Sequence, residues 1–306
     1  MSSHLSYVEA VVVGAFQGVT ELFPVSSLGH SVLIPALVGG RWAQDLNVSA
    51  PESPYLAFIV GLHVATAAAL LVFFWRDWLA IIGGFITSVR HRRVSTPAER
   101  LAWLMVLATI PVGIAGLALE HAFRTTLGRP VPAAAFLAIN GVVLYAGERL
   151  RRRTPAVVNS SAPAHSAPPV KSGLTPSDER IAELPMGQGV LIGSAQILAL
   201  LPGISRSGIT MVAGLWRGLN HEEAARFSFL LATPVILAAG VLKIPDLFGP
   251  LGEGIHGQVL AGSVASFVAA YLAVRYLTRY FETRTLTPFA IYCTVVGIGS
   301  LIWLLR

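Results

Sequence analysis

The chain has 306 residues, of which 54% are hydrophobic and only 12% are charged, and its mean hydropathy is +0.66. Soluble domains carry about 25% charged residues, so this composition excludes a soluble globular protein and predicts an all-α, polytopic membrane protein. The net charge of +6 does not indicate a nucleic-acid partner, because the Lys and Arg residues cluster in particular loops, as the positive-inside rule describes.

The first apolar run, residues 8–38, is long enough to enter a bilayer but is interrupted by polar residues. It carries Glu21 and His30 and is broken by Pro24 and Gly29. Ionisable side chains at membrane depth are costly and indicate a functional site. Broken helices are tolerated there only where the freed backbone is buried in protein or lines a wet cavity. We therefore predict a broken, re-entrant segment that contributes to a site.

Further apolar runs along the chain predict membrane spans. They lie at about 55–75, 101–119, 132–147, 224–242, 258–277 and 288–305. Residues 78–89 are apolar but too short to cross, and we place them in the membrane interface. Residues 154–177 are rich in Pro, Ser and Ala and predict a disordered linker. A second broken, re-entrant segment is predicted at 187–219.

The basic residues predict the orientation of these spans. The following loops hold most of the Lys and Arg and are assigned to the cytoplasm: 76–100, 149–180, 217–226 and 275–284. The first broken segment is then entered from outside and the second from the cytoplasm. A shift of 179 residues aligns Gln17 with Gln196 and Ser26 with Ser205, which favours an inverted-topology repeat. The predicted organisation is a first repeat at 1–150, a cytoplasmic linker at 151–185 and a second repeat at 186–306.

The first broken segment combines an acid with hydroxyl groups. Gln17 and Glu21 are four residues apart and share a helix face. Pro24 cannot continue that helix, so Ser26 or Ser27 can cap a new half-helix whose N–H groups point into the break. His30 lies one turn further on.

The second broken segment supplies an arginine. The chain breaks at Pro202-Gly203, Ser205 or Ser207 can cap the next helix, and Arg206 lies at its start. Two helix N-termini, a guanidinium and several hydroxyls form a site for an anion, above all phosphate. Glu21 would repel such an anion, and a bridging divalent cation would remove the repulsion. The combination predicts phosphoryl chemistry at a membrane-embedded site.

Two stretches carry a family resemblance. They are residues 18–30, G-V-T-E-L-F-P-V-S-S-L-G-H, and residues 201–210, L-P-G-I-S-R-S-G-I-T. Together they resemble the two signature motifs of the bacterial undecaprenyl-diphosphate phosphatases of the bacitracin-resistance type. The resemblance implies hydrolysis of undecaprenyl diphosphate to undecaprenyl phosphate and inorganic phosphate, which recycles the lipid carrier for peptidoglycan synthesis and confers bacitracin resistance. It also implies a multi-pass protein of the bacterial inner (plasma) membrane, competition by bacitracin for the polyprenyl diphosphate, and leaves a homodimer open.

The resemblance also implies roles for individual residues. The expected catalytic residues are Glu21, Ser27, His30 and Arg206. The expected substrate-binding residues are Gln17, Ser26, Ser205, Ser207 and Thr210. Glu21 and Gln17 are the expected ligands of Mg²⁺ or Ca²⁺, although the family's motif allows two carboxylates and this chain has only one. Ser27, His30 or a water is the nucleophile, and a mouth on the periplasmic (extracytoplasmic) side is favoured.

The sequence also allows other functions and other roles for single residues. A secondary transporter or lipid flippase could share the inverted-repeat architecture. An acid-phosphatase-type lipid phosphatase is rejected, because Val212 stands where that motif requires His. Arg206 could also be a structural counter-ion of Glu21. For His63 and Thr66, which lie in the next span, we favour a packed core role over a place in the site.

Overall fold

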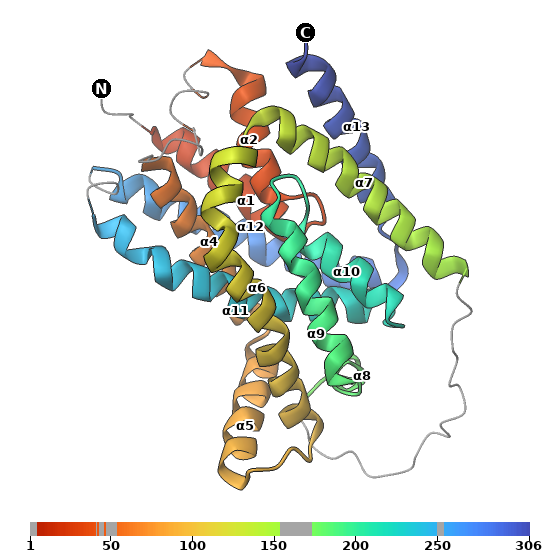
Figure 1. Ribbon diagram of the computed structural model, residues 1–306. Coiled ribbons are helices and arrows are strands. Elements are labelled where there is room, and N and C mark those ends of the chain that lie inside the picture. Colours follow the sequence, from red (N-terminus) through yellow and green to blue (C-terminus); the bar gives the residue numbers. More distant parts are fainter. Residues whose placement is uncertain (1–4, 41, 43–45, 47–53, 154–172, 250–253) are drawn as a thin grey trace.

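The structure is a computed structural model that describes residues 5–40, 42, 46, 54–153, 173–249 and 254–306 (Figure 1). In these ranges the chain is helical and contains no strand. The helices of the first half are α1 (Tyr7–Leu22), α2 (Ser27–Val38), α4 (Pro54–Phe73), α5 (Trp75–His91), α6 (Pro97–Leu127) and α7 (Pro130–Arg153). Those of the second half are α8 (Pro176–Ala182), α9 (Met186–Ser194), the 3₁₀ helix η1 (Ala195–Leu200), α10 (Arg206–Trp216), α11 (His221–Phe248), α12 (His256–Thr283) and α13 (Thr287–Leu304).

The helices confirm the all-α, polytopic prediction. Within the described residues, five helices are long and apolar enough to cross a membrane: α6, α7, α11, α12 and α13. A sixth span arises if α4 and α5, which meet at an angle of 86°, are counted together. The predicted span boundaries agree with these helices to within a few residues, apart from longer ends on α6, α7, α11 and α12. The chain is therefore a multi-pass membrane protein.

The sharp bend between α4 and α5 lies close to the boundary predicted between the span at 55–75 and the apolar segment at 78–89. α4 ends at Phe73 and α5 begins at Trp75. From there α5 and the first turns of α6 project from the rest of the molecule (Figure 1). Large apolar side chains of α5, such as Leu79 and Ile86, are exposed. The separate helix agrees with the prediction that 78–89 does not continue the preceding span, and its place in the membrane interface stays a prediction.

A buried ionic cluster joins this bend to the second half. Arg226 of α11 donates to both carboxylate oxygens of Asp178, at 3.0 and 2.6 Å, and to Asp77 of α5 at 3.1 Å. Burial would raise the pKa of Asp178, but the hydrogen bonds and charge of Arg226 outweigh it and hold that pKa below its usual value. Asp178 belongs to α8, so the cluster fixes the start of the second half. Most of the predicted linker, 154–172, lies outside the described residues.

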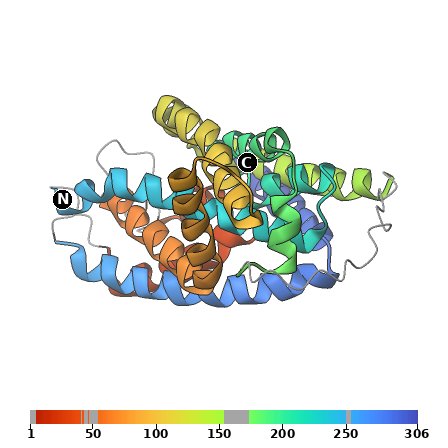
Figure 2. The ribbon, with the colours of Figure 1, turned by 90° about the horizontal axis from the view of Figure 1, so that it is seen from below.

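Two closely packed helix pairs support the centre of the fold. α1 lies on α12, which runs along one side of the molecule, and α7 lies on α13 (Figure 2). A Cβ atom on Gly18 of α1 would lie 2.9 Å from the backbone nitrogen of Ala270, so only glycine allows this approach. The packing leaves Gln17 and Glu21 on an adjoining face of α1, toward α4.

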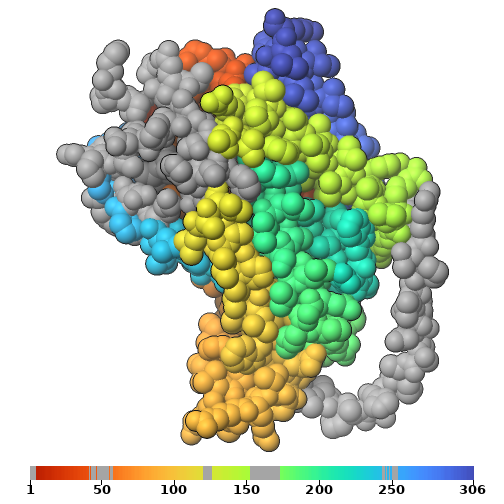
Figure 3. All heavy atoms as spheres, in the orientation of Figure 1, coloured from red at the N-terminus to blue at the C-terminus, as the bar shows by residue number. Residues whose placement is uncertain are grey.

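Each half also contains a broken helix, α1–α2 in the first half and α9–η1–α10 in the second. On the face shown in Figure 3, α9 lies beside α6. The relation of the two halves by inversion stays a prediction.

Candidate functional site

The first break has the form predicted from the sequence. α1 ends at Leu22, Phe23 is extended, and α2 begins at Ser27. The turn between them contains Pro24, which cannot continue a helix. Ser26 is the N-cap of α2, and its Oγ accepts from the N–H of Gly29 at 3.2 Å. The prediction that one of the two serines caps α2 is confirmed, and the capping residue is Ser26.

The second break is also confirmed, with one addition. The chain passes from α9 into η1 and turns at Pro202-Gly203. Gly203 has φ +115°, a conformation that side-chain-bearing residues rarely adopt. Ser205 then caps α10 by accepting from Gly208 N–H at 3.2 Å. The 3₁₀ helix was not predicted, because its residues read as ordinary apolar sequence.

The two breaks meet in space. Gly203 N–H donates to Ser26 Oγ at 3.2 Å, and a Cβ atom on Gly29 would lie 2.8 Å from Gly203 Cα. Ser26 has φ +70°, a strained conformation that costs on the order of 1–3 kcal/mol for a residue other than glycine. Its Oγ accepts one N–H from each break, so Ser26 is held as a cross-link between the two halves.

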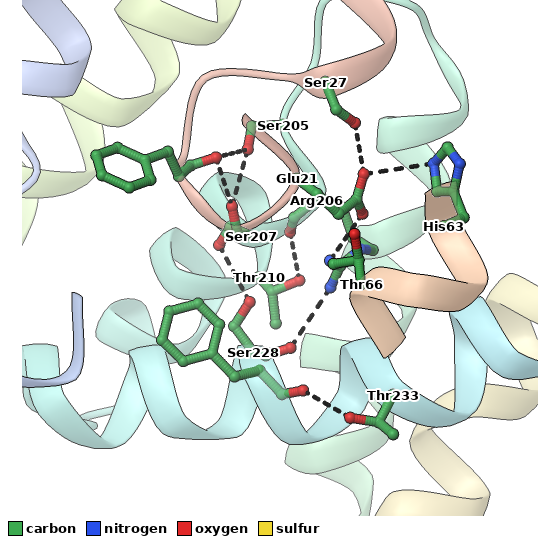
Figure 4. A network of polar contacts seen from close by, with 12 residues as sticks. Glu21, Ser27, His63, Thr66, Ser205, Arg206, Ser207, Thr210, Ser228 and Thr233 are labelled. Carbon is green, nitrogen blue, oxygen red and sulfur yellow. Dashed lines mark hydrogen bonds and ion pairs between the residues drawn. The ribbon is translucent and has the colours of Figure 1, made fainter. Parts of the chain in front are cut away.

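Glu21 lies at the centre of the polar cluster (Figure 4). One carboxylate oxygen accepts from Arg206 at 3.0 Å. The other accepts from Ser27 Oγ at 2.5 Å and from Gln17 Nε2 at 3.1 Å. The Glu21 and Arg206 side chains are only 7% and 11% exposed. A buried ion pair therefore joins the two motifs, as their predicted meeting requires.

His63 also belongs to this cluster, and our preference for a core role was wrong. Its Nε2 lies 3.4 Å from Glu21 Oε2 and 3.2 Å from Gln17 Nε2, while Nδ1 lies 2.9 Å from the carbonyl of Ile59. The His63 side chain is 31% exposed and is thus more accessible than those of Glu21 and Arg206. The available signal was an imidazole inside an apolar span. Thr66 is fully buried and bonds the carbonyl of Leu62, which confirms its core role.

The hydroxyls of α10 do not reach Glu21. Ser207 Oγ donates to the carbonyl of Phe23 at 3.1 Å, and Ser205 Oγ lies 3.0 Å from Ser207 Oγ (Figure 4). Thr210 Oγ1 donates to the backbone carbonyl of Arg206 at 2.7 Å. All three residues are at most 2% exposed. In this structure the two serines tie the start of α10 to the first break, whereas the Thr210 bond lies within α10.

His30 lies apart from the Glu21 cluster. Its Nδ1 is 2.7 Å from the carbonyl of Ser26, and its Nε2 is 2.9 Å from the hydroxyl of Tyr292 in α13. The two rings are stacked with centroids 5.7 Å apart. The structure therefore joins Ser27, and not His30, to the carboxylate.

The predicted metal ligands, Glu21 and Gln17, lie side by side. Among the described residues no group of three or more His, Cys, Asp or Glu could hold a metal ion alone. Mg²⁺ is commonly held by one or two carboxylates together with substrate phosphates and waters. Gln17 makes both of its side-chain contacts through Nε2, and its carbonyl oxygen is a ligand that such cations accept. The donor set thus fits a hard divalent cation that the substrate's phosphate oxygens help to hold.

The arrangement has the parts of a phosphoryl-transfer site. A hydroxyl lies within hydrogen-bond distance of a carboxylate that can accept its proton. The guanidinium of Arg206, from the other half of the chain, donates to the second oxygen of the same carboxylate. In this place it can also bind an anion. The cluster is largely buried, which strengthens electrostatic interactions with a bound phosphate.

Comparison with known proteins agrees with this chemistry. Residues 10–299 match the family described as bacitracin resistance protein BacA. The chain is 77% identical to the undecaprenyl-diphosphatase of Mycolicibacterium paratuberculosis (strain ATCC BAA-968 / K-10) and 76% identical to that of Mycobacterium avium (strain 104), over 99% of each chain. It is 52% identical to undecaprenyl-diphosphatase 1 of Frankia casuarinae, over 96% of this chain and 97% of the relative.

Proposed function

The chain belongs to the bacitracin resistance protein BacA family, and from this membership we propose that it is an undecaprenyl-diphosphatase. It hydrolyses undecaprenyl diphosphate to undecaprenyl phosphate and inorganic phosphate, and so returns the lipid carrier to peptidoglycan synthesis. The observation that carries the proposal is the convergence of Ser27 and Arg206, from opposite halves of the chain, on the two oxygens of Glu21.

The geometry supports Ser27 as the nucleophile. Ser27 Oγ attacks the terminal phosphorus, and Glu21 accepts the hydroxyl proton. The bond from that phosphorus to the bridging oxygen breaks, and the electron pair leaves with the lipid monophosphate. Water then attacks the phosphoserine, the Ser27 oxygen leaves and regains a proton, and inorganic phosphate is released. Arg206 binds the phosphoryl oxygens and stabilises their charge in both transition states.

The remaining residues play supporting roles in this proposal. Gln17 and His63 hold the carboxylate of Glu21 in place through the contacts described above. Ser26, Ser205 and Ser207 hold the two breaks together and so support the phosphate site. Thr210 supports the first turn of α10 through the Arg206 carbonyl. His30 fixes the start of α2 through the Ser26 carbonyl and Tyr292, and so orients Ser27 three residues earlier in the chain.

We further propose that Glu21 and Gln17 hold Mg²⁺ or Ca²⁺ together with the substrate. When bound, the cation would supply positive charge that offsets the repulsion between Glu21 and the diphosphate.

Removal of divalent cations is expected to slow phosphate release by at least about tenfold, because metal-ion charge stabilisation is worth several kcal/mol. The measurement is the release rate in excess chelator and after return of Mg²⁺ or Ca²⁺. Thermal unfolding in the same chelator serves as the control and should not change. Full activity in chelator would contradict the proposed cation.

The membrane side and the partners are also part of the proposal. The basic loops support an inner-membrane protein whose first break is entered from the periplasmic side. Bacitracin, which the family description names, would compete for the lipid diphosphate. The residues around Glu21 described above come from one chain, and the homodimer that the resemblance leaves open stays part of the proposal.

The direct test is phosphate release by the purified protein in detergent, with a polyprenyl diphosphate as substrate. We expect stoichiometric release of inorganic phosphate and formation of the polyprenyl monophosphate. A transporter or flippase would instead move the lipid across vesicles without hydrolysis. Movement without phosphate release would overturn the proposal in favour of that alternative.

A further inference from the structure

Asn140, which lies outside both motifs, contacts the two breaks at the same time. It belongs to α7 and is only 1% exposed. Its Nδ2 donates to the carbonyl of Pro24 at 3.2 Å, and its Oδ1 accepts from the backbone N–H of Ser205 at 3.0 Å. We propose that Asn140 is a positioning residue that sets Arg206 at the correct distance from Ser27 and Glu21 during the reaction. This inference rests on the proposed function.

The two backbone groups that Asn140 contacts have no partner within a regular helix. Pro24 lies in the turn after α1, and Ser205 is the N-cap of α10. Both residues are buried, and a buried peptide group without a hydrogen bond costs about 1–3 kcal/mol. A carboxamide can donate to one group and accept from the other, whereas aspartate lacks the donor and leucine lacks both functions.

These contacts lie close to the reacting groups in the sequence. Ser205 immediately precedes Arg206, and Pro24 lies midway between Glu21 and Ser27. A change in the distance between the Pro24 carbonyl and the Ser205 amide therefore moves Arg206 relative to Glu21 and Ser27. Asn140 determines that spacing directly, because the same side chain bonds both groups.

The backbone of α7 makes Asn140 a fixed reference point. A Cβ atom on the neighbouring Gly141 would lie 2.6 Å from the backbone nitrogen of Thr294, so the backbones of α7 and α13 are in close contact there. A Cβ atom on Gly203 would lie 2.5 Å from the carbonyl oxygen of Ala133, so α7 also supports the second break. Asn140 Nδ2 is further placed by Cys293 Sγ at 3.3 Å.

Replacing Asn140 is expected to lower kcat with little change in KM. A misplacement of about 1 Å can cost on the order of 100-fold in rate, so we expect Asn140→Asp and Asn140→Leu to lower kcat by about 10–100-fold. KM should stay within about threefold, since Arg206 and the helix N-termini still bind the phosphates before reaction. The measurement is steady-state phosphate release by folded, monodisperse protein in detergent.

Thr294→Val provides a matched control at the same helix interface. The Thr294 hydroxyl bonds the carbonyl of Ala290 in its own helix, so its loss should leave kcat unchanged. A double-mutant cycle adds a second readout. If Asn140 acts through Arg206, Asn140→Leu should cost much less kcat in an Arg206→Lys background than in the wild type.

The outcomes separate this inference from the proposed function. Absence of phosphate release by the wild-type protein would overturn the function itself. With an active wild type, a normal kcat for both Asn140 variants would overturn the positioning role. Equal kcat losses in the two backgrounds would overturn it as well, because Asn140 would then act independently of Arg206. A failure of both variants to fold would also overturn it, because that result assigns Asn140 to structure alone.

Discussion

Replacing Arg206 with alanine is expected to lower kcat for phosphate release by about a thousandfold or more. An arginine that stabilises a transferring phosphoryl group is worth about 10³–10⁵ in rate. Arg206 is also the cation bonded to Glu21, at 3.0 Å in a largely buried site. Loss of one partner of a buried ion pair destabilises a protein by about 3–5 kcal/mol, so kcat must be measured on the fraction that remains folded.

Two lysine variants separate catalysis from stability. Arg206→Lys keeps the charge but cannot bind phosphate bidentately, and it should recover only part of the lost activity. Arg226→Lys is the matched control, because Arg226 is likewise a buried arginine bonded to carboxylates, Asp178 and Asp77. It should lower the unfolding temperature and leave kcat close to that of the wild type. Near-normal turnover by Arg206→Ala would contradict the proposal that Arg206 binds the phosphoryl oxygens and stabilises their charge.

Replacing Glu21 with glutamine is expected to lower kcat by about 10²–10⁴-fold, the range associated with loss of a general base. The amide has nearly the same shape as the carboxylate but cannot take the proton of Ser27, whose Oγ lies 2.5 Å away. It is also a weaker ligand for a divalent cation. The measurement is phosphate release at saturating polyprenyl diphosphate.

Glu148→Gln is the matched control for this variant. Glu148 is also a buried carboxylate, with one oxygen 2.8 Å from Nε2 of His221, but it lies outside the Glu21 cluster. Its replacement should lower the stability of the protein and leave kcat unchanged. If Glu21→Gln retained wild-type kcat, Glu21 would be a structural counter-ion of Arg206, and another base would have to accept the proton.

The breaks could be predicted from the sequence because their causes are local. Pro24 and Pro202 end helices by removing an N–H donor, and Ser26 and Ser205 cap helices that begin one residue later. The meeting of Glu21 with Arg206 could be inferred because each charge is too costly to bury alone at membrane depth.

The parts that could not be predicted depend on helix rotation and packing. His63 faces Glu21 because of the angle at which α4 lies beside α1. The imidazole signals a polar role, but an otherwise apolar helix does not reveal which neighbour it faces. Asn140 likewise reads as an ordinary polar residue until α7 is placed against both breaks. As candidates for the N-cap, Ser26 and Ser27 were also equivalent in the sequence, and only the family resemblance gave them different roles. The structure separates them, because Ser26 accepts two backbone N–H groups and Ser27 alone reaches the carboxylate.

The ion pair between the two halves has a consequence for biosynthesis. Arg206 lies 185 residues after Glu21, and a ribosome adds about 5–20 residues per second, so Glu21 is made roughly 10–40 s before its cation. A carboxylate without a partner is costly inside the bilayer. The ion pair, and the hydrogen bond from Gly203 N–H to Ser26 Oγ, therefore form only after residues 203–206 have been synthesised. The first break therefore reaches the membrane before the second, and it completes its contacts only after the second has arrived.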